Sequence, residues 1–480
     1  MILNLSILIG LAVLWLGLLG FVIPFNAGAM SAPSLFALLV LPPMLFALGI
    51  ACWRSWKTKR EAAKQQADVD AQAKAQADRV AQARQTHDAE LHERQHFAEC
   101  RAVWANVVAE SMPAWCDTAP AQALWTQGAP IAEVSERTAA IAEALSETLA
   151  SAITETPALA WLPLYVLPGQ GQDGRALLEQ VRLSLHDALI EAGHDEAATT
   201  ACKFLPGNGS LNDRVIALLR NDPTQPGLLL LACDSPLAEQ PDEDEFEPLD
   251  PQQVELQRWH GKPGQAVVLQ LFTRAGLAAP VVTADTTSDE ADPYQPYWER
   301  DHGRKDDASG WGRVPGQYRA GLTDLPPIAR IHLSRELYSD SALPTGNKLS
   351  QQLRATVEGA LINACLRPLP FDPAESGDDR SHTLAWLAHN CGGVDVGGSR
   401  LAAVATVLSY FESELNPIND ASNVVTEFGD VGGARSALLN AIAITQAAQL
   451  QQPVLIAEFD GETRIVSGVV SHALPEEQTT

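Results

Sequence analysis

Two long apolar runs begin the chain, and each predicts a helix that crosses a membrane. Ile2 to Phe25 and Leu35 to Trp53 carry no charged residue, and each is about long enough to span a hydrocarbon core. Basic residues crowd the segment after the second run, which by the positive-inside rule puts both termini in the cytoplasm. We therefore expect a transmembrane hairpin over residues 1–54. A cleaved signal peptide is the alternative, but no basic residue precedes the first run.

The segment 55–100 predicts a helical stalk. It is rich in Ala, Gln, Asp, Glu, Lys and Arg and contains no Gly or Pro, a composition that favours a helix. Val69, Val80 and Leu91 recur every eleven residues, a spacing that could pair helices in a right-handed coiled coil. A single solvated helix is the preferred interpretation, because Leu and Ile do not recur at the seam positions of a coiled coil.

Beyond residue 100, apolar runs alternate with amphipathic helical patterns. Apolar residues at 104, 107, 108, 112 and 115 predict a first helix. Further helices are expected at 131–153, 175–192, 211–220, 349–366, 401–411 and 435–450. Strands are expected at 161–167, 227–233, 266–272, 329–333, 383–388, 424–428, 454–459 and 464–470. This alternation predicts an α/β fold with a layered mixed sheet, divided into domains at 101–320 and 321–480.

The charge balance excludes a general nucleic-acid binder. The chain has 33 Lys and Arg against 59 Asp and Glu, a net charge of −26, and a phosphate backbone needs a basic surface. The seven cysteines include no CxxC pair, which excludes a zinc ribbon or a thioredoxin-like motif. An odd number of cysteines in a long chain indicates a reducing compartment.

Two polar segments interrupt the body. Residues 239–250 carry seven acidic side chains and predict a solvated acidic loop. Residues 285–318 are Gly-rich but contain five large aromatic residues, and such residues in a long loop are typical of a partner-binding surface. The predicted partner-binding residues are Tyr294, Tyr297, Trp298, Trp311 and Tyr318. The equal alternative is that these side chains fold back onto the body.

Motifs for cofactors, metals and catalysis are incomplete. Gly169, Gly171 and Gly174 match GxGxxG, but without a clear βαβ unit a flexible turn is the preferred interpretation. His382, His389 and Cys391 lack a second ligand cluster. We therefore predict no cofactor, no metal and no catalytic residue.

The C-terminal third resembles thiolase-like condensing enzymes. It repeats a plan of strand, Gly-rich turn and helix, first at His389-Asn-Cys-Gly-Gly and again at Gly429-Asp-Val-Gly-Gly-Ala-Arg435. The family places a histidine after each of two such strands. His389 matches the first, but Asp430 stands at the second, and Cys202 is a loose candidate for the nucleophile. The resemblance implies a degenerate, non-catalytic thiolase-like fold.

The whole layout resembles the type VI secretion lipase-adaptor family of proteobacteria. The hairpin, the stalk and the acidic α/β body carry this resemblance, together with Trp161-Leu-Pro-Leu-Tyr-Val-Leu-Pro168 and the turn Gly429 to Arg435. It implies a protein of the bacterial inner membrane with its soluble domain in the cytoplasm. Its partners would be a phospholipase effector and the secretion spike protein, and it would not be an enzyme.

Two alternatives to the adaptor stay open. One is a thiolase-like or acyl-transfer enzyme, active or degenerate, with a site near Cys202, His389 and Cys391. The other is a structural membrane protein that oligomerises through its stalk.

Overall fold

The computed structural model describes residues 10, 13–15, 17, 32–94, 96–129, 137–169, 171–194, 201–236, 261–277, 310–367, 383–393 and 398–473. The chain forms two compact units, Met1–Asp88 and Ala89–Thr480. Each unit is described by itself below. The predicted acidic loop at 239–250 lies outside the described residues. Of the first predicted transmembrane run, only residues 10, 13–15 and 17 are described.

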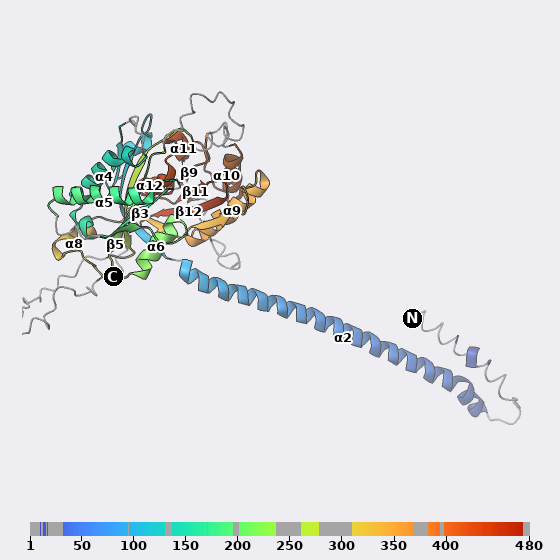
Figure 1. Ribbon diagram of the computed structural model, residues 1–480. Coiled ribbons are helices and arrows are strands. Elements are labelled where there is room, and N and C mark those ends of the chain that lie inside the picture. The colour runs from blue at the N-terminus through green and yellow to red at the C-terminus, as the bar shows by residue number, and fades with distance from the viewer. Residues whose placement is uncertain are drawn as a thin grey trace, which may run out of the picture. The chain divides into compact units, whose positions relative to one another are not determined.

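A single long helix, α2 (Ala32–Arg94), dominates the first unit (Figure 1). The prediction of a helical stalk is confirmed as far as Arg94, while residues 97–100, which were assigned to the stalk, begin a strand. Within the described part of the chain, no helix has the length and apolarity that crossing a membrane requires.

The second unit consists of two consecutive segments whose elements follow the same order, apart from one additional short helix in each segment. The first contains β1 (Phe97–Val107), β2 (Ala123–Gln127), α3 (Arg137–Ala140), α4 (Ala142–Glu155), β3 (Leu164–Leu167), α5 (Gly174–Glu191), β4 (Cys202–Phe204), α6 (Leu211–Asn221), β5 (Gly227–Asp234) and β6 (Ala266–Arg274). The second contains β7 (Ala329–His332), β8 (Arg335–Tyr338), α9 (Asn347–Asn363), β9 (Trp386–His389), α10 (Gly398–Tyr410), β10 (Ala421–Asn423), α11 (Val424–Glu427), α12 (Arg435–Leu450), β11 (Val454–Asp460) and β12 (Arg464–His472). Short helices outside this plan are η2 (Ala114–Thr118), η3 (Pro157–Trp161), α8 (Gly316–Thr323) and η6 (Gly432–Ala434).

The two segments repeat one sheet topology. The strands join in the order β10-β9-β11-β12-β7-β1-β6-β5-β3-β4, with β2 beside β1 and β8 beside β12. Outward from the β7–β1 junction, β1-β6-β5-β3-β4 and β7-β12-β11-β9-β10 correspond strand for strand. The directions also agree, because β5–β6 and β11–β12 are antiparallel while β3–β5 and β9–β11 are parallel. The prediction of a layered α/β fold with a mixed sheet is confirmed.

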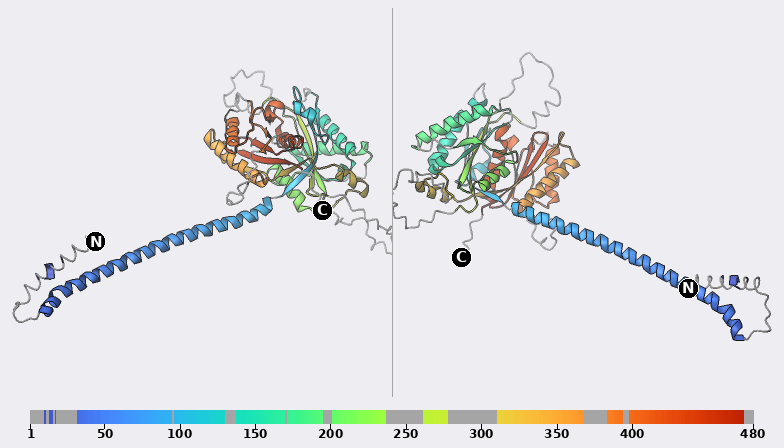
Figure 2. Two further views of the ribbon diagram at one scale, coloured as in Figure 1. Left: turned by 180° about the vertical axis from the view of Figure 1, so that it is seen from behind. Right: turned by 60° about the horizontal axis from the view of Figure 1, so that its bottom comes forward.

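Helices cover both faces of each half of the sheet. Leu228 and Leu230 of β5 lie in a central hydrophobic cluster with α6 and α12, whereas Leu229 and Leu231 lie in a second cluster with α4 and α5. In the other half, a third cluster packs α9 and α10 against β11 and β12. The two halves lie side by side, one in cyan and green and the other in orange and red (Figures 1 and 2). The helices α6 and α12 therefore form a central layer shared by both halves.

Two predicted elements have the wrong type. Apolar residues from Trp104 to Trp115 match a helical spacing, but residues 97–107 form β1, in which nearly every residue is buried. A strand covered on both faces has a continuous apolar run, which periodicity alone does not separate from a helix. Likewise, the predicted strand at 424–428 is the short helix α11, and the strand β10 precedes it.

Local side-chain caps define where two helices begin. Asp173 accepts hydrogen bonds from the backbone N–H groups of Arg175 and Ala176 at the start of α5. Ser210 accepts one from the N–H of Asp213 at the start of α6. Such caps satisfy donors that have no partner within the helix.

Two backbone turns, one in each of the two repeated segments, are in direct contact. A methyl group added at Gly169, after β3, would lie 2.7 Å from the Cα atom of Gly433, just before α12. A methyl group at Gly433 would in turn clash with the backbone of Gly169. Glycine is needed at both positions because no side chain fits between these two stretches of backbone.

Replacing Gly433 with Ala should therefore destabilise the protein by about 1–3 kcal/mol, the usual cost of inserting a methyl group into a tightly packed site. Urea unfolding of the full-length protein measures this cost. Gly393→Ala is the matched control, since a methyl group there has no atom within 4 Å. Equal stability of the two variants would contradict the close contact.

Candidate functional site

A cavity of about 460 Å³ lies where the central helices begin. Its walls come from both repeats: the turn after β3, the first turns of α6 and α12, and one face of β11 and β12. Alternate residues Ile456, Glu458 and Asp460 of β11 line it, because successive side chains of a strand point to opposite faces. We refer to this cavity as the central pocket.

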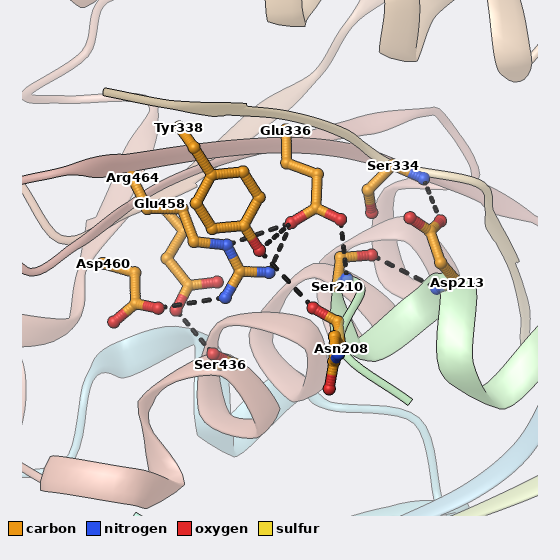
Figure 3. Close-up of polar contacts among 10 residues, drawn as sticks. All are labelled: Asn208, Ser210, Asp213, Ser334, Glu336, Tyr338, Ser436, Glu458, Asp460 and Arg464. Atoms are coloured by element: carbon orange, nitrogen blue, oxygen red, sulfur yellow. Dashed lines mark hydrogen bonds and ion pairs between the residues drawn. The ribbon is translucent and has the colours of Figure 1, made fainter. Parts of the chain in front are cut away.

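Arg464 of β12 organises one wall of the central pocket (Figure 3). Its Nη2 atom lies 2.6 Å from Oε2 of Glu336, and its Nε atom lies 3.0 Å from the same oxygen. Its Nη1 atom lies 3.0 Å from Oδ2 of Asp460. The Tyr338 hydroxyl donates to Glu336 as well, at 3.0 Å. Charge-assisted hydrogen bonds of this kind fix the geometry of the group they surround.

The same network reaches the start of α6. Oε1 of Glu336 accepts a hydrogen bond from the backbone N–H of Ser210 at 3.1 Å. Oδ1 of Asp213 accepts one from the N–H of Ser334 at 2.8 Å, while burial raises the pKa of that carboxyl group. Helix α6 belongs to the first repeat, and Ser334 and Glu336 belong to the second. These contacts hold the two repeats together at the pocket (Figure 3).

A buried carboxylate anchors the part of the wall that Arg137 and Gly433 form. Asp234, at the end of β5, has no exposed surface. Its oxygens accept hydrogen bonds from Nε and Nη2 of Arg137, both at 2.7 Å, from the N–H of Gly433 at 2.6 Å and from the N–H of Ser235 at 2.9 Å. Four donors offset the cost of burying a charge. This carboxylate positions the turn that leads into α12.

Glu458 and Ser436 form a pair with a different character. The Ser436 hydroxyl, in the first turn of α12, donates to Oε1 of Glu458 at 2.5 Å (Figure 3). Glu458 is 7% exposed, and within the described ranges it has no Lys or Arg within ion-pair distance. Burial raises the pKa of the Glu458 carboxyl group, and the hydrogen bond from Ser436 opposes that shift. A carboxylate with a raised pKa is a stronger base than an exposed one.

Asn440 lies one helical turn beyond Ser436 and also lines the central pocket. It is 2% exposed, and neither atom of its amide group has a hydrogen-bond partner among the residues that the structure describes. A buried amide without partners is uncommon in folded proteins. Its donor and acceptor are therefore available to a polar group of a bound molecule.

The structure does not bring the predicted thiol site together. Cys202 lies on β4 and packs in the cluster with α4 and α5, whereas Cys391 packs in the cluster with α9 and α10. Neither residue lines the central pocket. Burial raises the pKa of both thiols, that of Cys391 to about 12. A thiol must lose its proton to act as a nucleophile.

His389 also does not line the central pocket. It is 1% exposed at the end of β9. Its Nε2 atom lies 3.1 Å from the carbonyl oxygen of Pro417, and its Nδ1 atom accepts from the N–H of Cys391. Burial lowers the pKa of His389 to about 4. Histidine fixed by two backbone contacts acts here as part of the packing.

Asp430 lines the central pocket, but its carboxylate already has hydrogen-bond partners within the protein. Its carboxylate accepts from the N–H of Gly432 at 3.0 Å and from Nη2 of Arg435 at 3.1 Å. The turn from Gly429 to Arg435, singled out by its glycines, thus forms part of the pocket wall. Among the described residues, no group of three His, Cys, Asp or Glu side chains has the arrangement of a metal site.

Two of the five predicted partner-binding residues have described positions. Trp311 is 4% exposed and packs in the cluster with α4 and α5. Tyr318 stacks on Trp161, with ring centroids 4.5 Å apart. These two side chains fold back onto the body. Tyr294, Tyr297 and Trp298 lie outside the described residues, and a partner contact through this segment stays a prediction.

Sequence reasoning missed the polar residues that define the central pocket. Ser436, Glu458 and Arg464 belong to no motif and are separated along the chain. The alternation of polar and apolar residues on β11 carried a weak signal, because Glu458 and Asp460 interrupt an otherwise apolar strand. Nothing local indicated that α12 would present Ser436 to them.

Thiol labelling tests the inert cysteines. In the native full-length protein, iodoacetamide should label the exposed Cys52 and Cys365 first. Cys202 and Cys391 are buried with raised pKa values and should react only after unfolding. Peptide mass spectrometry at several times of reaction measures the order. Rapid labelling of native Cys202 would restore it as a candidate nucleophile.

The raised pKa of Glu458 predicts how stability depends on pH. As pH rises above the pKa of an exposed glutamate, the Glu458 carboxyl group loses its proton in the unfolded chain before it does so in the folded protein. The contribution of Glu458 to folding stability therefore falls with rising pH, until the folded carboxyl group also ionises. The variant Glu458→Gln should gain stability relative to the parent between pH 4 and 8, as measured by urea midpoints. A constant difference across that range would contradict the shift.

No protein-family model and no curated protein matches the chain. Solved structures that resemble it include OleA E117D of Xanthomonas campestris bound with cerulenin, at 11% identity and a TM-score of 0.39, covering 78% of this chain and 96% of that one. Another is the peroxisomal 3-ketoacyl-CoA thiolase of Saccharomyces cerevisiae, at 8% identity and a TM-score of 0.41, covering 79% and 98%. A third is the acyltransferase ChlB3, at 14% identity and a TM-score of 0.40, covering 79% and 98%.

These comparisons contradict two expectations. The similar structures are thiolase-like condensing enzymes and an acyltransferase, so the prediction of a type VI secretion adaptor is wrong, as is the prediction that the chain is not an enzyme. Nothing in the comparisons supports the secretion-system resemblance. They agree instead with the other resemblance, to thiolase-like enzymes, at the level of the fold.

Proposed function

We propose that this chain is an acyl-transfer enzyme that works in the central pocket, with Ser436 as nucleophile and Glu458 as base. The observation that carries this proposal is the 2.5 Å hydrogen bond from the Ser436 hydroxyl to Glu458. A nucleophile in contact with a base, at the wall of a cavity, is the arrangement that covalent catalysis uses. The substrate class is an activated acyl group, an ester or a thioester.

The proposed step balances within these two side chains and the substrate. Ser436 Oγ bonds to the carbonyl carbon of the acyl group, and its proton passes to Glu458. The bond from that carbon to the leaving oxygen or sulfur then breaks, and the leaving group takes the proton from Glu458. Water or another acceptor removes the acyl group from Ser436 by the reverse sequence of proton transfers.

The surroundings of the pair support this role. Ser436 is partly accessible from the central pocket, whereas Glu458 is buried behind it. Ser436 lies in the first turn of α12, where the positive end of the helix dipole favours negative charge on a reacting oxygen. Arg435 and Arg464 lie close enough to Glu458 to lower its pKa, which opposes the larger effect of burial.

Covalent labelling tests the nucleophile. The full-length protein is incubated with p-nitrophenyl acetate and, separately, with acetyl-coenzyme A, and intact mass is followed by peptide mapping. An acetyl adduct on Ser436 is expected. Glu458→Gln should slow its formation by roughly 10²–10⁴-fold, the usual contribution of a general base, and Ser436→Ala should abolish it.

Ser409→Ala is the matched control, because Ser409 is an exposed serine on the outer helix α10. This variant should acylate like the parent. Acylation that persists in Ser436→Ala, or that maps to another residue, would reject Ser436 as the nucleophile. Circular dichroism of each variant separates loss of reaction from loss of fold.

A further inference from the structure

The first described part of α2 exposes large apolar side chains. Leu41, Met44, Leu45, Phe46 and Leu48 are between 52% and 66% exposed. Soluble proteins seldom leave so many apolar side chains uncovered in one short segment. The chemistry of the residues that follow indicates what covers them.

Aromatic and basic residues form a stripe on the next three turns of α2. Their positions differ by three, four, seven and eleven residues, so they share one face of the helix. The members of this stripe are Trp53, Trp56, Lys57, Arg60 and Lys64. At 1.5 Å per residue the stripe is about 16 Å long. We refer to it as the Trp/Lys stripe.

Two of the three cations of the stripe lie over its own indole rings. Lys57 Nζ lies 5.9 Å from the ring centroid of Trp53, and Arg60 Cζ lies 5.1 Å from that of Trp56. Both tryptophans remain more than half exposed, at 61% and 57%. The stripe therefore presents flat amphipathic rings and positive charge on the same exposed surface.

The charge of this segment is opposite to that of the chain. Residues 54–64 contain five basic residues and one acidic residue, whereas the whole chain has a net charge of −26. Residues 65–94 of the same helix contain six acidic and four basic residues. Within residues 54–94, a net positive charge is thus found only in the turns that border the exposed apolar segment.

We infer that residues 41–64 of α2 bind the surface of a bilayer that contains anionic phospholipids. The apolar side chains enter the acyl region, and the tryptophans lie at the interface, where indole rings are favoured. The basic side chains contact the lipid phosphates, an interaction that strengthens with each Lys or Arg near the surface. This inference is independent of the proposed acyl transfer.

Vesicle flotation of the full-length protein tests the site. The probes are vesicles of pure phosphatidylcholine and vesicles with about one third phosphatidylglycerol. Binding should favour the anionic vesicles and weaken as salt rises, because exposed charges are screened. Removing two positive charges with Lys57→Gln and Arg60→Gln together should weaken binding to anionic vesicles by roughly thirtyfold.

The matched control is Lys74→Gln with Arg79→Gln, which removes the same charge from the same helix outside the stripe. This control should bind within about twofold of the parent. Equal binding of the parent to both kinds of vesicle would overturn the inference, as would equal losses in the two double variants. The Trp53→Ala, Trp56→Ala double variant should bind both kinds of vesicle less well, and unchanged binding would also count against the site.

Discussion

The contact between Gly169 and Gly433, held by the buried carboxylate of Asp234, is the constraint on which the rest of the body depends. Two backbone turns from different repeats meet without any side chain between them. Asp234 fixes this approach, because its carboxylate binds both the N–H of Gly433 and the guanidinium group of Arg137. A charge without exposed surface is tolerable only when its donors are in place, so this part of the protein has a single geometry.

That geometry determines where α12 begins, and α12 in turn separates the two halves of the sheet. Residues 437–447 of this helix are buried without interruption. A helix with sheet on both sides is apolar around most of its circumference, unlike a surface helix with one apolar face. Small residues such as Ala437, Ala441 and Ala443 allow the flanking strands to approach closely. The repeated topology places α6 in the same central hydrophobic cluster, and the central pocket lies where these two helices begin.

The polar groups of the central pocket divide by how they are paired. Asp430 and Asp460 each bind an arginine, and they act with Glu336 as structural anions. Glu458 has the hydroxyl of Ser436 instead, and its burial raises its pKa. A paired carboxylate is a poor base because its charge is already stabilised, whereas the environment of Glu458 favours proton uptake. The thiols of Cys202 and Cys391, by contrast, lie in two separate outer clusters and do not line this pocket.

Local sequence determined most of the helices and the buried strands. Helical periodicity predicted α12 and α6, and uninterrupted apolar runs predicted β5 and β6. The same kind of pattern failed for β1, because a strand covered on both faces has apolar residues at every position and so also matches a helical spacing. It failed again at Val424, where the apolar side chains pack from the short helix α11.

Tertiary structure alone decided the candidate site. Ser436 and Glu458 are 22 residues apart, and they meet because α12 packs against β11 with one particular rotation and register. Arg464 meets Glu336 across 128 residues through the pairing of β8 with β12. Such contacts depend on which strand lies beside which, and a local pattern of apolar and polar residues is compatible with many such arrangements. Sequence determined the elements, and the packing of two repeats around shared helices decided which of their side chains can react together.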